Sequence, residues 1–287
     1  MTGYRLGLAV RFRAKQIAIA SFQPFPYSRW RHNPRNVRDC MSSDTISSEP
    51  PSLPPMIAVV GCDGSGKSTV TALLGSWLAG FRPTVVCHLG KQSGNIGRSL
   101  ARLPLLGPKL ERSIYRKAKA AQTGTGPGLV TAVGIYAFAI RRERRFRRMM
   151  ALRRAGHIIV TDRFPQVELP GPMDGVGLGN ARPSGLVGWL ARRERRKFDA
   201  MVAHPPDLVL RLNVSFDVAQ ARKPDHRASA LARKIDDLSR LTFQGAPVVE
   251  IDADEPLENV EANARAAIAQ WLRDRFGMTI QPDSASR

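Results

Sequence analysis

The stretch GCDGSGKSTV, residues 61–70, follows directly on the apolar run MIAVV at residues 56–60. Its Gly61, Gly66 and Lys67–Ser68 match the spacing G-x-x-x-x-G-K-[ST], a loop whose glycines let backbone N–H groups surround phosphate oxygens. An apolar strand before the loop and a helical pattern after it are the context that this motif requires. The sequence therefore predicts a nucleoside-triphosphate site, and leaves open whether the terminal phosphate goes to water, a protein or a small acceptor.

The residues of this loop have separate expected roles. We expect the Lys67 ammonium to reach the β- and γ-phosphates of ATP, and the Ser68 hydroxyl to bind Mg²⁺. Asp63 has two open interpretations: it forms the turn, or it faces away from the donor and accepts a hydrogen bond from a hydroxyl of a second substrate. Thr69 is more typical of a helix-packing residue. The candidate nucleotide-binding set is Gly61, Asp63, Gly64, Ser65, Gly66, Lys67, Ser68 and Thr69.

Beyond the loop, short apolar runs alternate with helical patterns. The runs occupy residues 56–60, 84–88, 157–162, 207–214 and 246–252, and the helical patterns cover 67–79, a long segment that ends near 154, 186–201 and 256–276. Strands that are apolar on both faces and alternate with helices are typical of a parallel sheet covered on both sides. The sequence therefore predicts an α/β, three-layer P-loop NTPase fold with a five-stranded parallel sheet.

The first 55 residues differ from the rest of the chain. They lack a sustained period and end in the Ser/Pro-rich stretch MSSDTISSEPPSLPP (41–55). We interpret residues 1–55 as a disordered basic tail or as the product of an upstream start codon, with Met41 or Met56 as the alternative start. An Arg-rich transit peptide is the competing interpretation. We expect a domain at 56–277 and a disordered tail at 278–287.

The chain of 287 residues is strongly basic, with a formal net charge of +20. Residues 1–40 hold eight Lys or Arg against one acid, and residues 141–154 hold eight Arg against Glu143. Such a balance suits nucleic acid, an anionic membrane surface or a polyphosphate substrate. We prefer the simpler interpretation of a solvated Arg-rich helix face plus a basic tail, because no nucleic-acid motif accompanies the charge.

Cysteine and histidine patterns do not indicate a metal site. Cys40, Cys62 and Cys87 form no CxxC pair, and the five histidines show no ligand spacing. Free thiols are typical of a reducing compartment, so we expect a cytoplasmic protein. The longest apolar run, residues 129–140, is shorter than a membrane span. A buried helix is its simplest interpretation, and an interfacial segment or a dimer face are alternatives.

Asp162 and Arg163 end the third predicted strand, in HIIVTDRF (157–164). Ligands of parallel α/β sheets bind at the carboxyl ends of strands, where the phosphate-binding loop also lies. We expect Asp162 to organise Mg²⁺ together with Ser68, directly or through water. The Arg163 guanidinium next to it is suited to forking onto phosphate oxygens.

Four segments, taken in order and spacing, resemble the motifs of thymidylate kinases: GCDGSGKST (61–69), HLGKQSGNIGRSL (88–100), TDRF (161–164) and PDLVLRLNVSFDVAQARK (206–223). The resemblance covers roughly residues 56–275. It implies a nucleoside-monophosphate-kinase-like fold with a helical lid, and transfer of the γ-phosphate of ATP to the phosphate of a nucleoside monophosphate, dTMP in that family. It also implies that Asp63 contacts the 3′-hydroxyl of the acceptor sugar. Arg163 would hold the acceptor phosphate, with Lys91 or Arg98 as partners.

The same resemblance directs attention to the lid. The P-loop holds Gly64 and Ser65 and no Arg, so a cation of the lid must meet the charge of the transition state. Arg222 and Arg227, with Lys223 between them, are the candidates, and a solvated helix–loop–helix is the alternative. The expected catalytic set is Lys67, Arg163, Arg222 and Arg227.

The segment PQVELPGPMDGVGLGN (165–180) departs from the family pattern, since it lacks the Ser-rich and Ala-Tyr-Gln residues beneath the base. The reaction class is therefore better supported than dTMP as acceptor. Two alternatives stay open: a P-loop kinase of another acceptor, such as a nucleoside or a sugar of polysaccharide metabolism, and a nucleotide-binding regulatory protein with little turnover. Glu168 and Asp174 are carboxylates that could serve a hydroxyl acceptor, although we prefer to treat both as ordinary loop residues.

Overall fold

A five-stranded parallel sheet forms the centre of the protein in a computed structural model, which describes residues 53–90, 127–181 and 184–282. The strands follow the order β2-β3-β1-β4-β5, and every neighbouring pair is parallel. The bounds are Met56–Gly61 for β1, Thr84–His88 for β2, Ile158–Asp162 for β3, Leu208–Asn213 for β4 and Val248–Asp252 for β5. The central strand β1 is buried along its whole length, which explains its unbroken apolar sequence.

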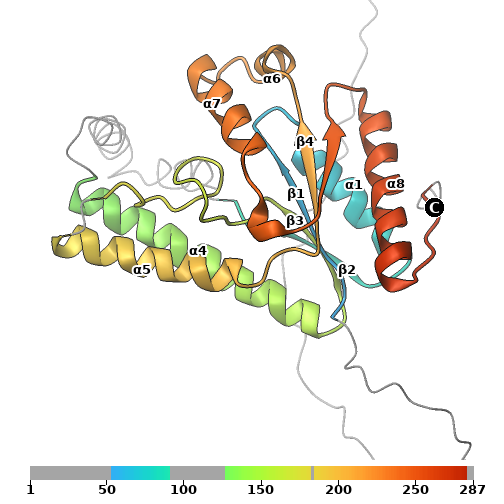
Figure 1. Ribbon diagram of the computed structural model, residues 1–287, viewed down its shortest axis with the longest axis horizontal. Helices are drawn as coiled ribbons and strands as arrows, with labels where there is room; N and C mark the ends of the chain where they lie inside the picture. Colours follow the sequence, from blue (N-terminus) through green and yellow to red (C-terminus); the bar gives the residue numbers. More distant parts are fainter. Residues whose placement is uncertain (1–52, 91–126, 182–183, 283–287) are drawn as a thin grey trace, which may run out of the picture. The chain divides into compact units, whose positions relative to one another are not determined.

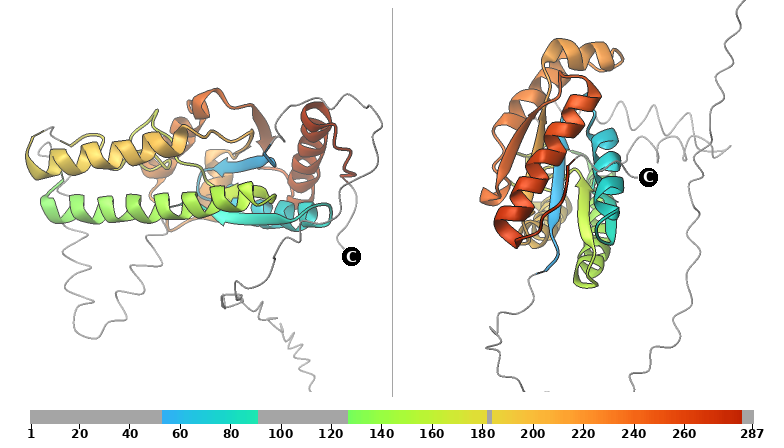
Figure 2. Two further views of the ribbon diagram at one scale, coloured as in Figure 1. Left: turned by 90° about the horizontal axis from the view of Figure 1, so that it is seen from below. Right: turned by 90° about the vertical axis from the view of Figure 1, so that its right-hand side faces the viewer.

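Helices cover both faces of this sheet, so the fold has three layers (Figures 1 and 2). On one face, Ile57 and Val59 of β1 pack in a core shared with α1 (Lys67–Ala79) and α8 (Leu257–Phe276). On the other face, the alternate residues of β1 pack against α4 (Leu129–Arg154) and α5 (Gly185–Val202). The alternation of side chains along a strand thus builds two separate cores, and the predicted P-loop NTPase fold is confirmed.

Two shorter helices and a 3-10 turn connect β4 to β5. Helix α6 spans Phe216–Arg222, α7 spans Ala228–Ser239 and η1 spans Phe243–Gly245. In Figure 1, α6 and α7 lie near the carboxyl end of β4. The P-loop begins at the carboxyl end of β1, which is the same end of the sheet. We call α6, α7 and the turn between them the lid, because they occupy the segment where the resemblance implies one.

The Arg-rich helix α4 is not simply a solvated face, which corrects part of the preferred interpretation. Its buried side chains recur at three- and four-residue spacing, and this stripe includes Arg142 and Arg153 as well as Phe146. Arg153 donates to the backbone oxygen of Pro54 at 2.7 Å and pairs with Asp207 at 2.5 Å. One arginine of α4 therefore fixes the start of the sheet, and Arg142 belongs to the site described below.

The folded domain extends past residue 277, where the sequence predicts that it ends. Ile280 is buried, and Trp77 Nε1 of α1 donates to the backbone oxygen of Gln281 at 3.2 Å. The first residues of the expected tail 278–287 therefore pack on the domain, because an apolar side chain there completes the core beside α1 and α8. The expected tail 1–55 lies outside the described residues except for its last three. Within the described ranges, no helix is both long and apolar enough to cross a membrane.

Candidate functional site

The loop between β1 and α1 takes a tight conformation that its glycines allow. Gly64 and Gly66 have φ angles of +91° and +78°, in the left-handed region that suits glycine. A Cβ atom on Gly64 would lie 2.9 Å from the backbone oxygen of Ala219 in α6, so the loop packs directly on the lid. Lys67 begins α1, and its Nζ donates to the Cys62 carbonyl at 3.0 Å. Burial, together with the nearby charge of Arg163, lowers the pKa of Lys67.

Ser68 and Asp162 meet at the predicted metal position. The Ser68 hydroxyl donates to Asp162 Oδ2 at 2.7 Å, while Asp162 Oδ1 is buried and has no hydrogen-bond partner in the part of the chain that is described. A hydroxyl beside a carboxylate with one unpaired oxygen fits Mg²⁺, which keeps waters and substrate phosphates as its other ligands. The described residues contain no group of three or more His, Cys, Asp or Glu that could hold a metal by itself.

His88, at the end of β2, contacts the same carboxylate. Its Nδ1 lies 3.0 Å from Asp162 Oδ2, and this hydrogen bond raises the pKa of His88. Burial would raise the pKa of Asp162, but the hydrogen bonds from His88 and Ser68 lower it, as does the charge of Lys67. Asp162 therefore stays ionised at neutral pH with or without a bound cation.

Asp63 lies at the centre of a cluster of cationic side chains. Its Oδ1 is 3.1 Å from Arg163 Nη2 and 3.7 Å from Lys67 Nζ. Its Oδ2 pairs with Lys234 Nζ of α7 and lies 3.5 Å from His226 Nδ1. Burial by itself raises the pKa of a carboxyl, but the hydrogen bond and charge of Lys234 and the charges of Lys67 and Arg163 hold the pKa of Asp63 well below its usual range. Asp63 is more than a turn former: it is the shared counter-ion of the P-loop, β3 and the lid.

Arg163 reaches this cluster through an unusual backbone conformation. Its φ angle of +71° lies in the left-handed region, which costs a non-glycine residue about 1–2 kcal/mol. Gly90 leaves room for the side chain, since a Cβ atom there would lie 2.7 Å from Arg163 Cδ. Strain of this kind persists only where surrounding contacts hold it, and it is typical of functional positions. The predicted acceptor-side arginine therefore faces the P-loop across the site.

Asp174 extends the cluster to helix α4. Its Oδ1 pairs with Arg142 Nη2 at 2.6 Å, and its Oδ2 lies 3.3 Å from Arg163 Nη1. Treating Asp174 as an ordinary loop residue is therefore wrong, because its buried carboxylate joins two arginines of the site. Glu168 does behave as a structural loop residue, since it accepts hydrogen bonds from Thr242 and Gln244 around η1.

The lid residues predicted to meet transition-state charge lie in different settings. Arg222 Nη1 donates to the backbone oxygens of Gly64 at 3.2 Å and Ala253 at 2.8 Å, so it holds the lid to the P-loop and to the end of β5. The side chains of Lys223 and Arg227 are exposed. Their role in catalysis stays a prediction, and Lys91 and Arg98 lie outside the described residues. Of the remaining loop positions, Ser65 is buried and Thr69 is exposed.

Two site residues, Lys234 and Arg142, were missed by the sequence reasoning, although each leaves a signal. Lys234 stands between Leu231 and Leu238 on the apolar stripe of α7, at spacings of three and four. Arg142 stands in the same way between Ala139 and Phe146 on the buried stripe of α4. A charged residue at a core-facing position of an amphipathic helix is unusual, and it predicts a buried ion pair.

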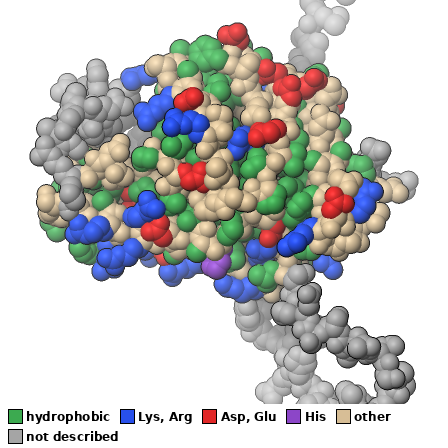
Figure 3. All heavy atoms as spheres, viewed as in Figure 1, with side chains coloured by type: hydrophobic (Ala, Val, Ile, Leu, Met, Phe, Trp, Pro, Cys, Tyr) green, Lys and Arg blue, Asp and Glu red, His purple; other side chains and the backbone are tan. Residues whose placement is uncertain are grey.

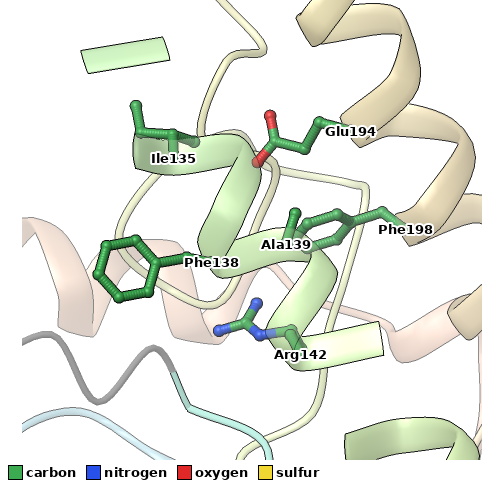
Figure 4. A pocket seen from close by; sticks show the side chains of 6 residues that line it. All are labelled: Ile135, Phe138, Ala139, Arg142, Glu194 and Phe198. Carbon is green, nitrogen blue, oxygen red and sulfur yellow. The ribbon is translucent and has the colours of Figure 1, made fainter. Parts of the chain in front are cut away.

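Two hollows border α5. A cavity of about 40 Å³ is lined by Ile135, Phe138, Ala139, Arg142, Glu194 and Phe198. Figure 4 shows the Phe198 ring between the Glu194 carboxylate and the Arg142 guanidinium. This volume is close to that of one water molecule and far below that of a ligand pocket. A second hollow of about 440 Å³ lies between α5 and residues 167–181. Its Glu168 is already hydrogen-bonded to the η1 region.

The sheet order, the Gly-Lys-Ser loop at the start of α1 and the Ser68–Asp162 pair define a protein of the P-loop NTPase fold. The chain is 38% identical over 251 residues to the Uncharacterized ATP-binding protein YghR of Escherichia coli K12, covering 84% of this chain and 100% of YghR. It is 41% identical over 220 residues to the Uncharacterized ATP-binding protein YghS of the same strain, covering 74% and 91%. The chain therefore belongs to the family of YghR and YghS.

A more distant similarity links the chain to a Probable thymidylate kinase of Pyrobaculum aerophilum. The two are 26% identical over 226 residues, which cover 76% of this chain and 97% of the relative. No family model matches the chain. These similarities confirm a P-loop, kinase-like family and do not single out thymidylate kinases within it, so the predicted resemblance is confirmed at that coarser level.

Proposed function

We propose that this protein transfers the γ-phosphate of ATP to the phosphate group of a nucleoside monophosphate, with dTMP as the first candidate acceptor. The names of the relatives support the donor, because YghR and YghS are described as ATP-binding, and the probable thymidylate kinase supports the acceptor class. The observation that carries the proposal is the pairing of Arg163 with Asp63, 3.1 Å apart, directly across from the P-loop lysine.

The donor half of the proposal rests on the P-loop. Backbone N–H groups of the loop and the start of α1 would surround the β- and γ-phosphates, and Lys67 would exchange its contact with the Cys62 carbonyl for one with phosphate oxygen. Ser68 and the unpaired oxygen of Asp162 would hold Mg²⁺, which supplies neutralisation of the charge on the transferring phosphoryl group. The chain contributes position and charge, because phosphoryl transfer needs little covalent chemistry from the protein.

The acceptor half rests on the state of the carboxylates. A hydroxyl acceptor profits from a general base whose pKa lies near neutrality. Asp63 is a poor base because its neighbours hold its pKa well below its usual range, and Asp174 is bound to Arg142 and Arg163. A phosphate acceptor is already ionised at neutral pH and needs a cation instead. Arg163 and Lys234 provide that charge at the site, which favours a phosphate over a sugar hydroxyl.

The experiment is an ATP-consumption screen of the full chain with Mg²⁺ across nucleoside monophosphates, nucleosides and sugars. We expect turnover with nucleoside monophosphates, and we expect Lys67→Ala to abolish it. In Arg163→Lys the KM for the acceptor should rise at least about tenfold while the KM for ATP changes little, because lysine cannot make the forked contact. Arg275→Lys, an exposed arginine of α8, is the matched control. Turnover with nucleosides or sugars alone, or unchanged acceptor kinetics in Arg163→Lys, contradicts the proposal.

A further inference from the structure

Helices α4 and α5 run side by side in the same direction, so their N-terminal ends lie together (Figures 1 and 2). Ala132 near the start of α4 packs with Leu190 near the start of α5, and Glu143 pairs with Lys197 further along both helices. Large apolar side chains at this shared end are 44% to 70% exposed. We call them the apolar tip: Leu129, Val130, Val133, Leu186 and Trp189.

Behind the apolar tip, the same exposed faces of both helices carry arginine. In α4, residues at three- and four-residue spacing form one exposed stripe, which reads Val130, Val133, Ala137 and then Arg141, Arg144, Arg148. In α5, the exposed stripe reads Leu186, Trp189 and then Arg193, Arg196. Figure 3 shows Lys and Arg side chains gathered over this part of the molecule. We call the following residues the arginine band: Arg141, Arg144, Arg148, Arg193 and Arg196.

Acidic side chains of α4 and α5 do not neutralise the arginine band. The two helices contain thirteen Arg or Lys against three acids. Glu143 and Glu194 are buried. Glu143 pairs with Lys197, and Glu194 accepts hydrogen bonds from the backbone N–H groups of residues 177 and 178. The third acid, Asp199, pairs with Arg195 at 2.7 Å. The exposed stripes therefore present a net positive charge directly behind an apolar end.

We infer that the apolar tip and the arginine band together dock this protein on an anionic lipid surface. Apolar side chains that enter a bilayer interface, followed by cations at the level of the phosphates, are the two elements of peripheral membrane binding. A second copy of the chain is a poor occupant, because packing two tips together brings two arginine bands into proximity. Nucleic acid would neutralise the band but would leave the exposed Leu and Val side chains without a favourable environment.

The spacing along the helices agrees with such a surface. Arg193 lies one turn, roughly 6 Å, behind Trp189, and its guanidinium stacks 4.9 Å from the Trp189 ring centroid. A tip immersed by roughly 5–10 Å would place Arg193 among the lipid phosphates. Arg141 lies roughly 12 Å behind Val133, within reach of a surface potential that decays over about 8–10 Å. Tryptophan is itself enriched at bilayer interfaces.

The test is co-sedimentation of the full chain with vesicles of phosphatidylcholine containing about 30% phosphatidylserine, which supplies an anionic surface, and with vesicles of phosphatidylcholine alone. The tip variant is V130S/L186S/W189S, and its matched control is Leu257→Ser, an exposed leucine on α8. The band variant is R144Q/R148Q/R196Q, and its control is R273Q/R275Q on α8. Every variant keeps residues 1–52, so the basic tail contributes equally throughout, and unchanged circular dichroism and melting show that the folds are intact.

We expect binding to the anionic vesicles that weakens with salt, falls roughly 100-fold in the band variant and at least about tenfold in the tip variant, and is unchanged in both controls. Full binding by the tip variant overturns the inference, because the attraction would then be electrostatic alone. Equal binding to neutral vesicles also overturns it. Light scattering that shows a dimer in the wild type and a monomer in the tip variant would assign the tip to a second copy instead.

Discussion

The charge cluster around Asp63 makes a specific prediction for Asp63→Asn. The substitution removes the negative charge and leaves the cations of the P-loop, β3 and the lid facing one another. Breaking one partner of a buried ion pair costs about 3–5 kcal/mol. The Asp63 side chain keeps 16% of its exposure, so we expect a somewhat smaller loss of about 2–4 kcal/mol in the free energy of unfolding. For a domain of this size that corresponds to roughly 5–15 °C in melting temperature.

ATP should compensate for this loss, and the compensation is the decisive measurement. Oxygens of the triphosphate can neutralise Lys67, which the substitution would leave without its carboxylate partner, so saturating Mg²⁺–ATP should raise the melting temperature of the variant more than that of the wild type. Asp236→Asn is the matched control, since its contact with Arg240 is exposed and should contribute less than about 1 kcal/mol. Differential scanning fluorimetry with and without nucleotide gives all the values. Equal stability of the two variants, or a smaller ATP effect in Asp63→Asn than in the wild type, would refute the reasoning.

Three further predictions concern the contacts around this cluster. Gly90→Ala should displace the Arg163 side chain, because the new Cβ would overlap its Cδ. We expect the KM for the acceptor to rise about tenfold while the KM for ATP stays unchanged. An unchanged KM for the acceptor would contradict the packing argument. Lys234→Met should release the lid, so hydrogen exchange of amides in α7 should accelerate by about tenfold or more, and wild-type protection would show that the ion pair does not hold it. His88→Asn tests pH dependence without metal: the raised pKa of His88 contributes stability that is fully present below about pH 6.5 and is lost as pH rises through the raised value. Melting temperatures of wild type and His88→Asn should therefore differ at pH 5.5 and converge at pH 9, and a constant difference would exclude the proposed linkage.

The inner part of the sheet could be predicted from the sequence because β1, β3 and β4 are buried on both faces, whereas the edge strands β2 and β5 are only partly buried. The run 84–88 coincides with β2, and the runs 157–162 and 207–214 exceed β3 and β4 by one or two residues. The three inner strands lie between helices, so nearly every position in them must be apolar and the pattern has little ambiguity. The P-loop could also be predicted from the sequence, because local backbone geometry requires its glycines and the charge of the phosphates requires its lysine.

The rest of the site depends on contacts between distant segments, which spacing along the chain does not report. Asp63 and Lys234 are 171 positions apart and meet only because α7 folds back over the P-loop. Arg163 and Asp174 approach each other through left-handed backbone conformations. Aspartate is among the residues that adopt this conformation more often, but nothing in TDRF predicts it for Arg163. The sequence did contain one signal of these contacts, which is the charged residue in the apolar stripe of α4 and of α7. Such a residue indicates an ion pair, because a buried cation needs a partner.

The segment after Arg163 is where the sequence departs from the thymidylate kinase pattern. Its polar side chains are used by the fold: Gln166 bonds to the backbone N–H and oxygen of Leu169 and to the oxygen of Met173, and the Glu168 carboxylate is bound to the η1 region. A saturated side chain has no hydrogen-bonding capacity left with which to distinguish one base from another. Under the proposed function, recognition of the acceptor in the described part of the site would therefore be directed at phosphate, through Arg163 and the cations around Asp63. The proposed function therefore predicts strong discrimination between phosphorylated and unphosphorylated acceptors, and weak discrimination between bases by the side chains of that loop.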